Sequence, residues 1–234
     1  MANKQEVTVK TTNLPAGMTA GDLMNEFGVG ANDIVLPRIL LMQNTSEYVG
    51  EEKAKLGDLV NSQTLEVLGG FTKPIEIVPL KKLEDILVFD TTQQPQKFLK
   101  KLEATPINKG LKYEDVEDGI MVKRFLIYTF RCLLLEDIKK GTAYPYELTF
   151  KSTSLKAGKQ LASMMFQSLA MNQYPYNWAY QVLPSKEKNE SNYYAVLKTA
   201  KGAKLDPEQF AVAKHWSDQL RTKNVVTEDD SVPF

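Results

Sequence analysis

Residues 120–136 read IMVKRFLIYTFRCLLLE, the longest strand-like segment of the chain. β-Branched and aromatic residues dominate this segment, and residues of these types favour strands. A strand of this length rarely stays flat in a small sheet, so we expect it to bend or to carry a bulge, as barrel strands do at corners. The segment therefore predicts a curved, mainly β fold.

The residues that follow this segment alternate between strand and helix patterns. Residues 144–151 (YPYELTFK) predict a strand, and residues 155–171 (LKAGKQLASMMFQSLAM) predict a helix with Ser154 as its N-cap. The apolar residues that recur near helical spacing in this helix are Leu155, Leu161, Met165 and Leu169. Strands resume at residues 176–183 and 192–198. A closing helix is predicted over residues 206–221, because its opening DPEQ matches a capping box.

The part of the chain before residue 120 also contains sequence patterns that predict strands. The segments that predict them are residues 36–43, 57–68, 74–80 and 85–91. A charged bend at Lys81 and Lys82 separates the last two of these strands. Residues 92–119 are polar and charged and predict an excursion or a long loop.

This order of elements predicts an elaborated OB-fold, a small closed β-barrel, with one inserted helix and a C-terminal helix. A helix between the third and fourth strands of a small closed sheet is the OB-fold order, and a mixed α+β sandwich is the alternative. The predicted organisation is a flexible N-terminal arm (1–33), an OB-like domain (34–223) and a disordered acidic tail (224–234).

The composition excludes several classes of function. The 234 residues include one cysteine, Cys132, and one histidine, His215, so a disulfide framework and a Cys/His zinc site are excluded. No constellation of residues supports catalysis, and we expect no enzyme activity, metal or cofactor. The N-terminus lacks an apolar signal region and no apolar run could span a bilayer, so a cytoplasmic protein without a membrane partner is expected.

The charges are distributed unevenly along a chain that carries 29 basic and 29 acidic residues. Residues 120–204 hold 13 Lys and Arg against 5 Asp and Glu, whereas the last eleven residues hold three acids and no base. A basic segment followed by an acidic end suggests a nucleic-acid partner. A normally solvated surface explains the same counts.

Aromatic residues are interleaved with the basic ones in this segment. Binding of single strands without sequence preference needs rings on which bases stack and cations that follow the phosphates. Trp178, Tyr180, Tyr194 and Tyr128 are the leading candidates for stacking, although most strand aromatics pack inward. The predicted cationic contacts are Lys123, Arg124, Arg131, Lys151, Lys156, Lys159, Lys198 and Lys201.

The start of the 155–171 helix contains Ala157-Gly158-Lys159, which invites comparison with a P-loop. The comparison fails because Thr153 stands where the first glycine is needed, and Gln160 where Ser or Thr is needed. A helix N-terminus with nearby lysines remains a candidate phosphate site. A capped helix with solvated lysines explains the sequence equally well.

The chain ends in TEDDSVPF, in which consecutive acids precede an apolar residue, a proline and a terminal phenylalanine. This ending resembles the acidic tip of bacterial single-stranded DNA-binding proteins and the acidic, Phe-terminated tails of phage replication proteins that bind single strands. Val232 stands where the bacterial tips usually have Ile, and Ser231 interrupts the acids. A solubility tail is the alternative explanation.

The resemblance implies sequence-independent coating of single-stranded DNA during replication, recombination or repair, and it is compatible with a homo-oligomer. It also implies that the tail recruits a polymerase, helicase or primase. The residues expected to do so are Glu228, Asp229, Asp230, Val232, Pro233 and Phe234. The alternatives are a strand-annealing recombination mediator and a replisome adaptor that does not bind DNA.

Overall fold

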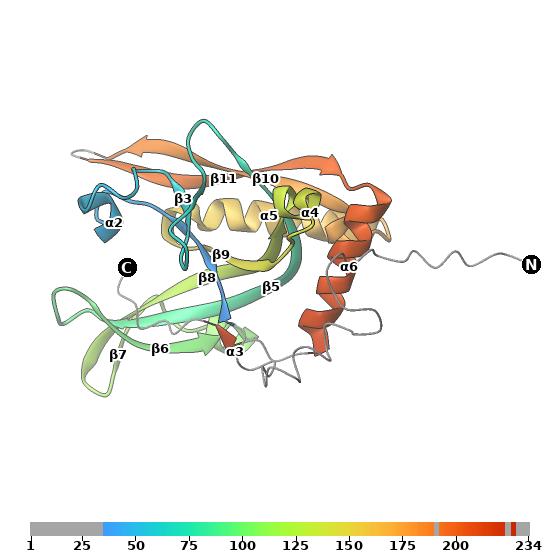
Figure 1. Cartoon of the computed structure of the whole chain (residues 1–234). Helices are drawn as coiled ribbons and strands as arrows, with labels where there is room; N and C mark the ends of the chain where they lie inside the picture. Colours follow the sequence, from blue (N-terminus) through green and yellow to red (C-terminus); the bar gives the residue numbers. More distant parts are fainter. Residues whose placement is uncertain (1–34, 190–191, 223–225, 228–234) are drawn as a thin grey trace, which may run out of the picture.

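A computed structural model describes residues 35–189, 192–222 and 226–227 of the chain (Figure 1). Two long antiparallel strands, β5 (Ile75–Asp90) and β8 (Ile120–Leu134), run side by side through the molecule. Their pairing extends from Ile77 opposite Leu134 to Asp90 opposite Val122. This confirms the strand expected from residue 120, but the irregularity of the ladder, between Pro79 and Lys81, adds its extra residue to β5 and not to the 120–136 segment.

The remaining strands flank this pair and form a curled half-barrel (Figure 1). Beside the N-terminal half of β5 lie β10 (Trp178–Lys188) and then β11 (Tyr193–Lys204). Beside β8 lie β9 (Pro145–Phe150), β2 (Arg38–Leu41), β3 (Leu59–Asn61) and β4 (Val67–Gly69). The short strands β1 (Val35–Leu36) and β12 (Val226–Thr227) pair with each other in parallel.

The far halves of β5 and β8 extend beyond the half-barrel and carry one further strand on each side. There β6 (Lys97–Glu103) pairs with β5, and β7 (Glu114–Glu117) pairs with β8. We call this four-stranded extension, residues 85–124, the arm. The short helix α3 (Pro106–Lys109) lies between β6 and β7.

The helix α5 (Leu155–Ala170) packs inside the curl, on the concave face of the sheet. Its residues Ala157 and Leu161 are buried with side chains such as Phe130 and Phe150. A Cβ at Gly158 would come within 2.7 Å of the Phe150 side chain, so the glycine permits the close approach of helix and sheet. Gly158 therefore has a packing role, which agrees with the rejection of a P-loop.

The convex face is covered at one end by α6 (Pro207–Thr222) and α4 (Leu135–Lys140). The expected capping box is confirmed, because the Gln209 amide donates to the Asp206 carboxylate over 2.8 Å and the Asp206 amide donates to Gln209 Oε1 over 3.2 Å. A smaller apolar cluster lies beneath α2 (Glu47–Gly50). Among the described residues, no helix has both the length and the apolar character to cross a membrane.

The prediction of a mainly β fold with an inserted helix and a C-terminal helix is confirmed, but several details were wrong. Residues 92–119, expected as an excursion or a long loop, contain β6, α3 and β7. The two strands expected on either side of Lys81 and Lys82 form one strand, β5, because the irregularity accommodates these lysines. Tyr176 lies in a 3₁₀ turn, η3 (Pro175–Asn177), ahead of β10. Residues 1–33 lie outside the described residues, as does the tail apart from Val226 and Thr227.

The free edge of β11 is joined to the other side of the half-barrel by side chains. The Gln43 amide donates to the Ala195 carbonyl over 2.8 Å and accepts from the Ala195 amide over 3.0 Å. Asn44 donates to the Tyr193 carbonyl, and Ser154 Oγ accepts from the Leu197 amide over 3.0 Å. Ser154 is the N-cap residue of α5, as predicted, but its hydroxyl accepts from β11 and makes no capping hydrogen bond to the helix.

Replacement of Gln43 by alanine is expected to lower the free energy of unfolding by about 1–3 kcal/mol, because it removes two hydrogen bonds and leaves the Ala195 main chain unpaired. Urea denaturation would measure the loss. Asn44→Ala is the control, since it removes one bond at an exposed position and should cost less than about 0.5 kcal/mol. Equal losses for the two variants would show that Gln43 does not hold β11 to the other side of the half-barrel.

Candidate nucleic-acid interface

An open groove of about 630 Å³ lies between α5 and β8. Its lining consists of Tyr128, Lys159, Ala162, Ser163, Phe166 and Gln167. We call it the α5–β8 groove. Because Lys159, Ala162, Ser163 and Phe166 follow helical i, i+3, i+4, i+7 spacing, one stripe of α5 forms its wall. The groove therefore joins two residues predicted to bind DNA, Tyr128 and Lys159, which are 31 positions apart in the sequence.

Phe166 is the residue of this groove that the sequence analysis missed. Its side chain is 70% exposed, although it lies on a helix that packs into the core. The signal was available in the helical pattern, because Phe166 falls on the stripe with Lys159 and not on the buried face with Leu161. Leu169, one of the apolar residues that recur near helical spacing in the sequence, is 54% exposed and does not share the burial of Leu161.

Cations already lie over the aromatic rings of this side of the molecule. Lys82 Nζ is 4.1 Å from the centre of the Tyr128 ring, and its ammonium also pairs with Glu84, which in turn pairs with Lys109. Lys201 Nζ is 3.6 Å from the Trp178 ring, whose indole nitrogen donates to Gln173. These cation–π contacts hold each ring beside a positive charge.

A third pair of this kind lies at the tip of the β10–β11 hairpin. Lys186 Nζ is 4.1 Å from the centre of the Tyr193 ring, which is 48% exposed, and Lys188 approaches the same ring. Tyr194, which was predicted to stack on a base, has its hydroxyl against Glu187 and lies on the opposite side of the hairpin strand. Tyr193 thus offers a more exposed ring for stacking than Tyr194 does.

Three of the predicted contacts are buried, which corrects the sequence-based assignment. Tyr180 has no exposed surface and belongs to the main core, where its hydroxyl lies 3.5 Å from Ser168 Oγ of α5. Arg131 is buried and pairs with Glu147 on the neighbouring strand at 3.0 Å. Arg124 is buried in the arm.

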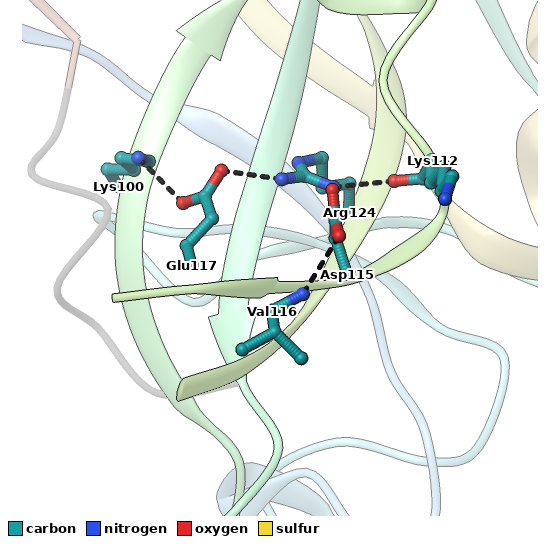
Figure 2. A network of polar contacts seen from close by, with 6 residues as sticks. All are labelled: Lys100, Lys112, Asp115, Val116, Glu117 and Arg124. Atoms are coloured by element: carbon teal, nitrogen blue, oxygen red, sulfur yellow. Dashed lines mark hydrogen bonds and ion pairs between the residues drawn. The ribbon is translucent and has the colours of Figure 1, made fainter. Parts of the chain in front are cut away.

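Figure 2 shows the network around Arg124. Its guanidinium donates to the Glu117 carboxylate and to the Lys112 carbonyl, and it lies 3.6 Å from Asp115. Glu117 also accepts from Lys100, and the bonds from Lys100 and Arg124 hold the pKa of this carboxyl below its usual value. Arg124 therefore links β8 to β7 and, through Glu117, to β6.

The other predicted lysines divide between the two ends of the molecule. Lys123 pairs with Glu114 in the arm at 2.9 Å. Lys156 and Lys198 are exposed on α5 and β11, and Lys151 is half-buried just before α5. From residue 151 to 204 the sequence holds eight lysines and two glutamates, whereas residues 85–124 hold seven bases and seven acids. The positive charge thus accompanies α5, β10 and β11, and the arm is neutral.

Replacement of Arg124 by alanine is expected to lower the free energy of unfolding by about 2–3 kcal/mol, because hydrogen bonds to charged groups are lost and Glu117 and Asp115 lose their shared cation. The folded variant should bind oligo-dT as the parent does. Urea denaturation and fluorescence anisotropy would measure the two quantities. Lys112→Ala is the control, since Lys112 meets Arg124 through its main-chain carbonyl. A loss of DNA affinity without a loss of stability would contradict the structural role.

Comparisons with known proteins identify a family. A family model described as Pam3 phage gp34-like protein matches residues 8–226, which include the half-barrel, the arm and the α5–β8 groove. No curated protein and no solved structure matches the chain. The family match extends over far more than half of the sequence, and the chain therefore belongs to the Pam3 phage gp34-like family.

Proposed function

We propose that this protein binds single-stranded DNA without sequence preference, in phage DNA replication, recombination or repair. The observation that carries the proposal is the α5–β8 groove, where exposed Phe166 and half-buried Tyr128 lie beside Lys159 and Lys82. Single-strand binders combine stacking rings with cations in this way. We interpret the half-barrel as an elaborated OB-fold, with α5 as the helix inserted between β9 and β10.

Binding would exchange the partners of the lysines. In the free protein the ammonium groups of Lys82 and Lys201 lie over the rings of Tyr128 and Trp178. An incoming base would take the ring face, and the displaced ammonium would pair with the adjacent phosphate. The lysine thus remains close to a negative charge or a π-face in both states. A duplex would gain less, because its base faces are already stacked on one another.

The C-terminal residues 228–234 complete the proposal, on the basis of their sequence. Their two aspartates and terminal Pro-Phe would recruit a replication protein by inserting the ring in an apolar pocket with a basic rim. The family to which the chain belongs takes its description from a phage protein, which supports the phage setting of the proposal.

Titration of labelled oligo-dT and of a matched duplex, followed by anisotropy at low and moderate salt, tests the proposal. We expect tight binding to the single strand, weak binding to the duplex, and a log–log salt slope of about −0.7 per neutralised phosphate. A chain without residues 228–234 should bind oligo-dT equally well or more tightly. Folded protein that binds neither the single strand nor the duplex would overturn the proposal. It would favour a replisome adaptor that does not bind DNA, an alternative that the burial of Tyr180, Arg124 and Arg131 supports.

Single replacements of Phe166 and of Tyr128 by alanine are each expected to weaken oligo-dT binding by about 1–3 kcal/mol, the usual contribution of one stacked base. Leu169→Ala is the matched control, because Leu169 is also exposed on α5 but lies outside the α5–β8 groove. Anisotropy gives the affinities, and circular dichroism checks that each variant is folded. If Phe166→Ala binds as tightly as Leu169→Ala, the groove does not hold bases.

A further inference from the structure

The arm carries a row of aromatic rings across its convex face. Phe98 of β6, Phe89 of β5, Phe125 of β8 and Tyr113, just before β7, contact one another in that order. The centres of successive rings are 5.7, 5.7 and 5.4 Å apart, and every contact is edge-to-face. The row thus crosses β6, β5 and β8 and ends beside the start of β7, with the edge-to-face geometry that aromatic pairs prefer.

This aromatic row is extended by two exposed aliphatic side chains. Val116 of β7 is 63% exposed and Met121 of β8 is 50% exposed, and they are direct cross-strand partners on the side of Lys123 and Phe125. Tyr113 itself is 54% exposed. We call the surface formed by Phe89, Phe98, Tyr113, Val116, Met121 and Phe125 the aromatic face.

The two faces of the arm differ in character. The concave face carries the polar network of Arg124, Glu117 and Lys100 beside buried apolar side chains, whereas the aromatic rings and the exposed aliphatic side chains lie on the convex face. At the other end of the sheet the same convex face is buried, because Phe210 and Trp216 of α6 pack with Val78 and Leu133. Among the described residues, the apolar cluster under α6 does not reach the arm. The aromatic face therefore lacks the cover that the rest of the convex face has.

The charges around the aromatic face disfavour a nucleic acid as its partner and are compatible with a second copy of the same face. Two ion pairs flank the aromatic face, Lys123 with Glu114 and Lys101 with Asp85. Because each lysine is matched by an acid and the arm as a whole is neutral, a polyanion gains little there. A second aromatic face would meet no net repulsion and would bury its own exposed rings.

We propose that two copies of this chain associate through their aromatic faces. Contact between identical surfaces gives a closed dimer with twofold symmetry, in which the two arms pack sheet against sheet. Six side chains are far fewer than the roughly 20–30 residues per partner of a standard interface, so we expect a weak, reversible dimer. The α5–β8 groove lies on the opposite, concave face, and the proposal does not depend on what it binds.

Sedimentation velocity of the full chain over a range of concentrations tests the proposal. We expect a monomer–dimer equilibrium, and we expect Val116→Ser with Met121→Ser to raise the dissociation constant at least tenfold. Leu169→Ser is the control, because Leu169 has a similar exposure on α5 and should leave the equilibrium unchanged. A monomer at every concentration would overturn the proposal, as would a dimer that the arm variant does not weaken.

Cross-linking provides a second measurement that does not require the interface to be disrupted. Cys132 is the one cysteine of the chain and is buried, so an introduced surface thiol is the reactive group of the folded protein. Val116→Cys treated with a short bis-maleimide should give a covalent dimer, whereas Leu169→Cys should give little. Equal yields from the two variants would count against the aromatic face as the contact.

Discussion

The continuous pairing of β5 with β8 is the constraint on which the rest of the structure depends. Near one end, these two strands carry β9 and β10, which bring the half-barrel around α5. Near the other end, the same strands carry β6 and β7 and become the arm. One ladder thus sets the position of the α5–β8 groove on its concave side and of the aromatic face on its convex side. A break in this pairing would separate both surfaces from the core.

The sequence predicted those elements whose pattern is local. The 120–136 strand, the helix from residue 155 and the capping box at Asp206 all depend on neighbouring residues, and all are present. The arm was missed because β6 and β7 are short, charged strands that are stabilised by cross-strand partners such as Lys100 and Glu117. Partners of this kind are distant in sequence and leave no periodicity to detect.

The candidate site could be predicted by residue type but not by position. Lys and aromatic residues of the basic segment were predicted as one set, and the structure brings Tyr128 together with Lys159 and Trp178 together with Lys201. Arg124, Arg131 and Tyr180 have the same residue types, yet each is buried. Whether a strand side chain faces solvent depends on irregularities and on which helix covers it, and neither can be deduced from alternation alone.

The side chains that bond to β11 also affect the tendency of the protein to aggregate through the edge of its sheet. A long strand at the end of a sheet is a template on which further strands can add, and such edges promote aggregation. Here Gln43, Asn44 and Ser154 occupy successive outward main-chain groups from Tyr193 to Leu197. An invading strand would have to displace all three side chains. The residues that complete the half-barrel therefore also protect its edge from the strand addition by which fibrils grow.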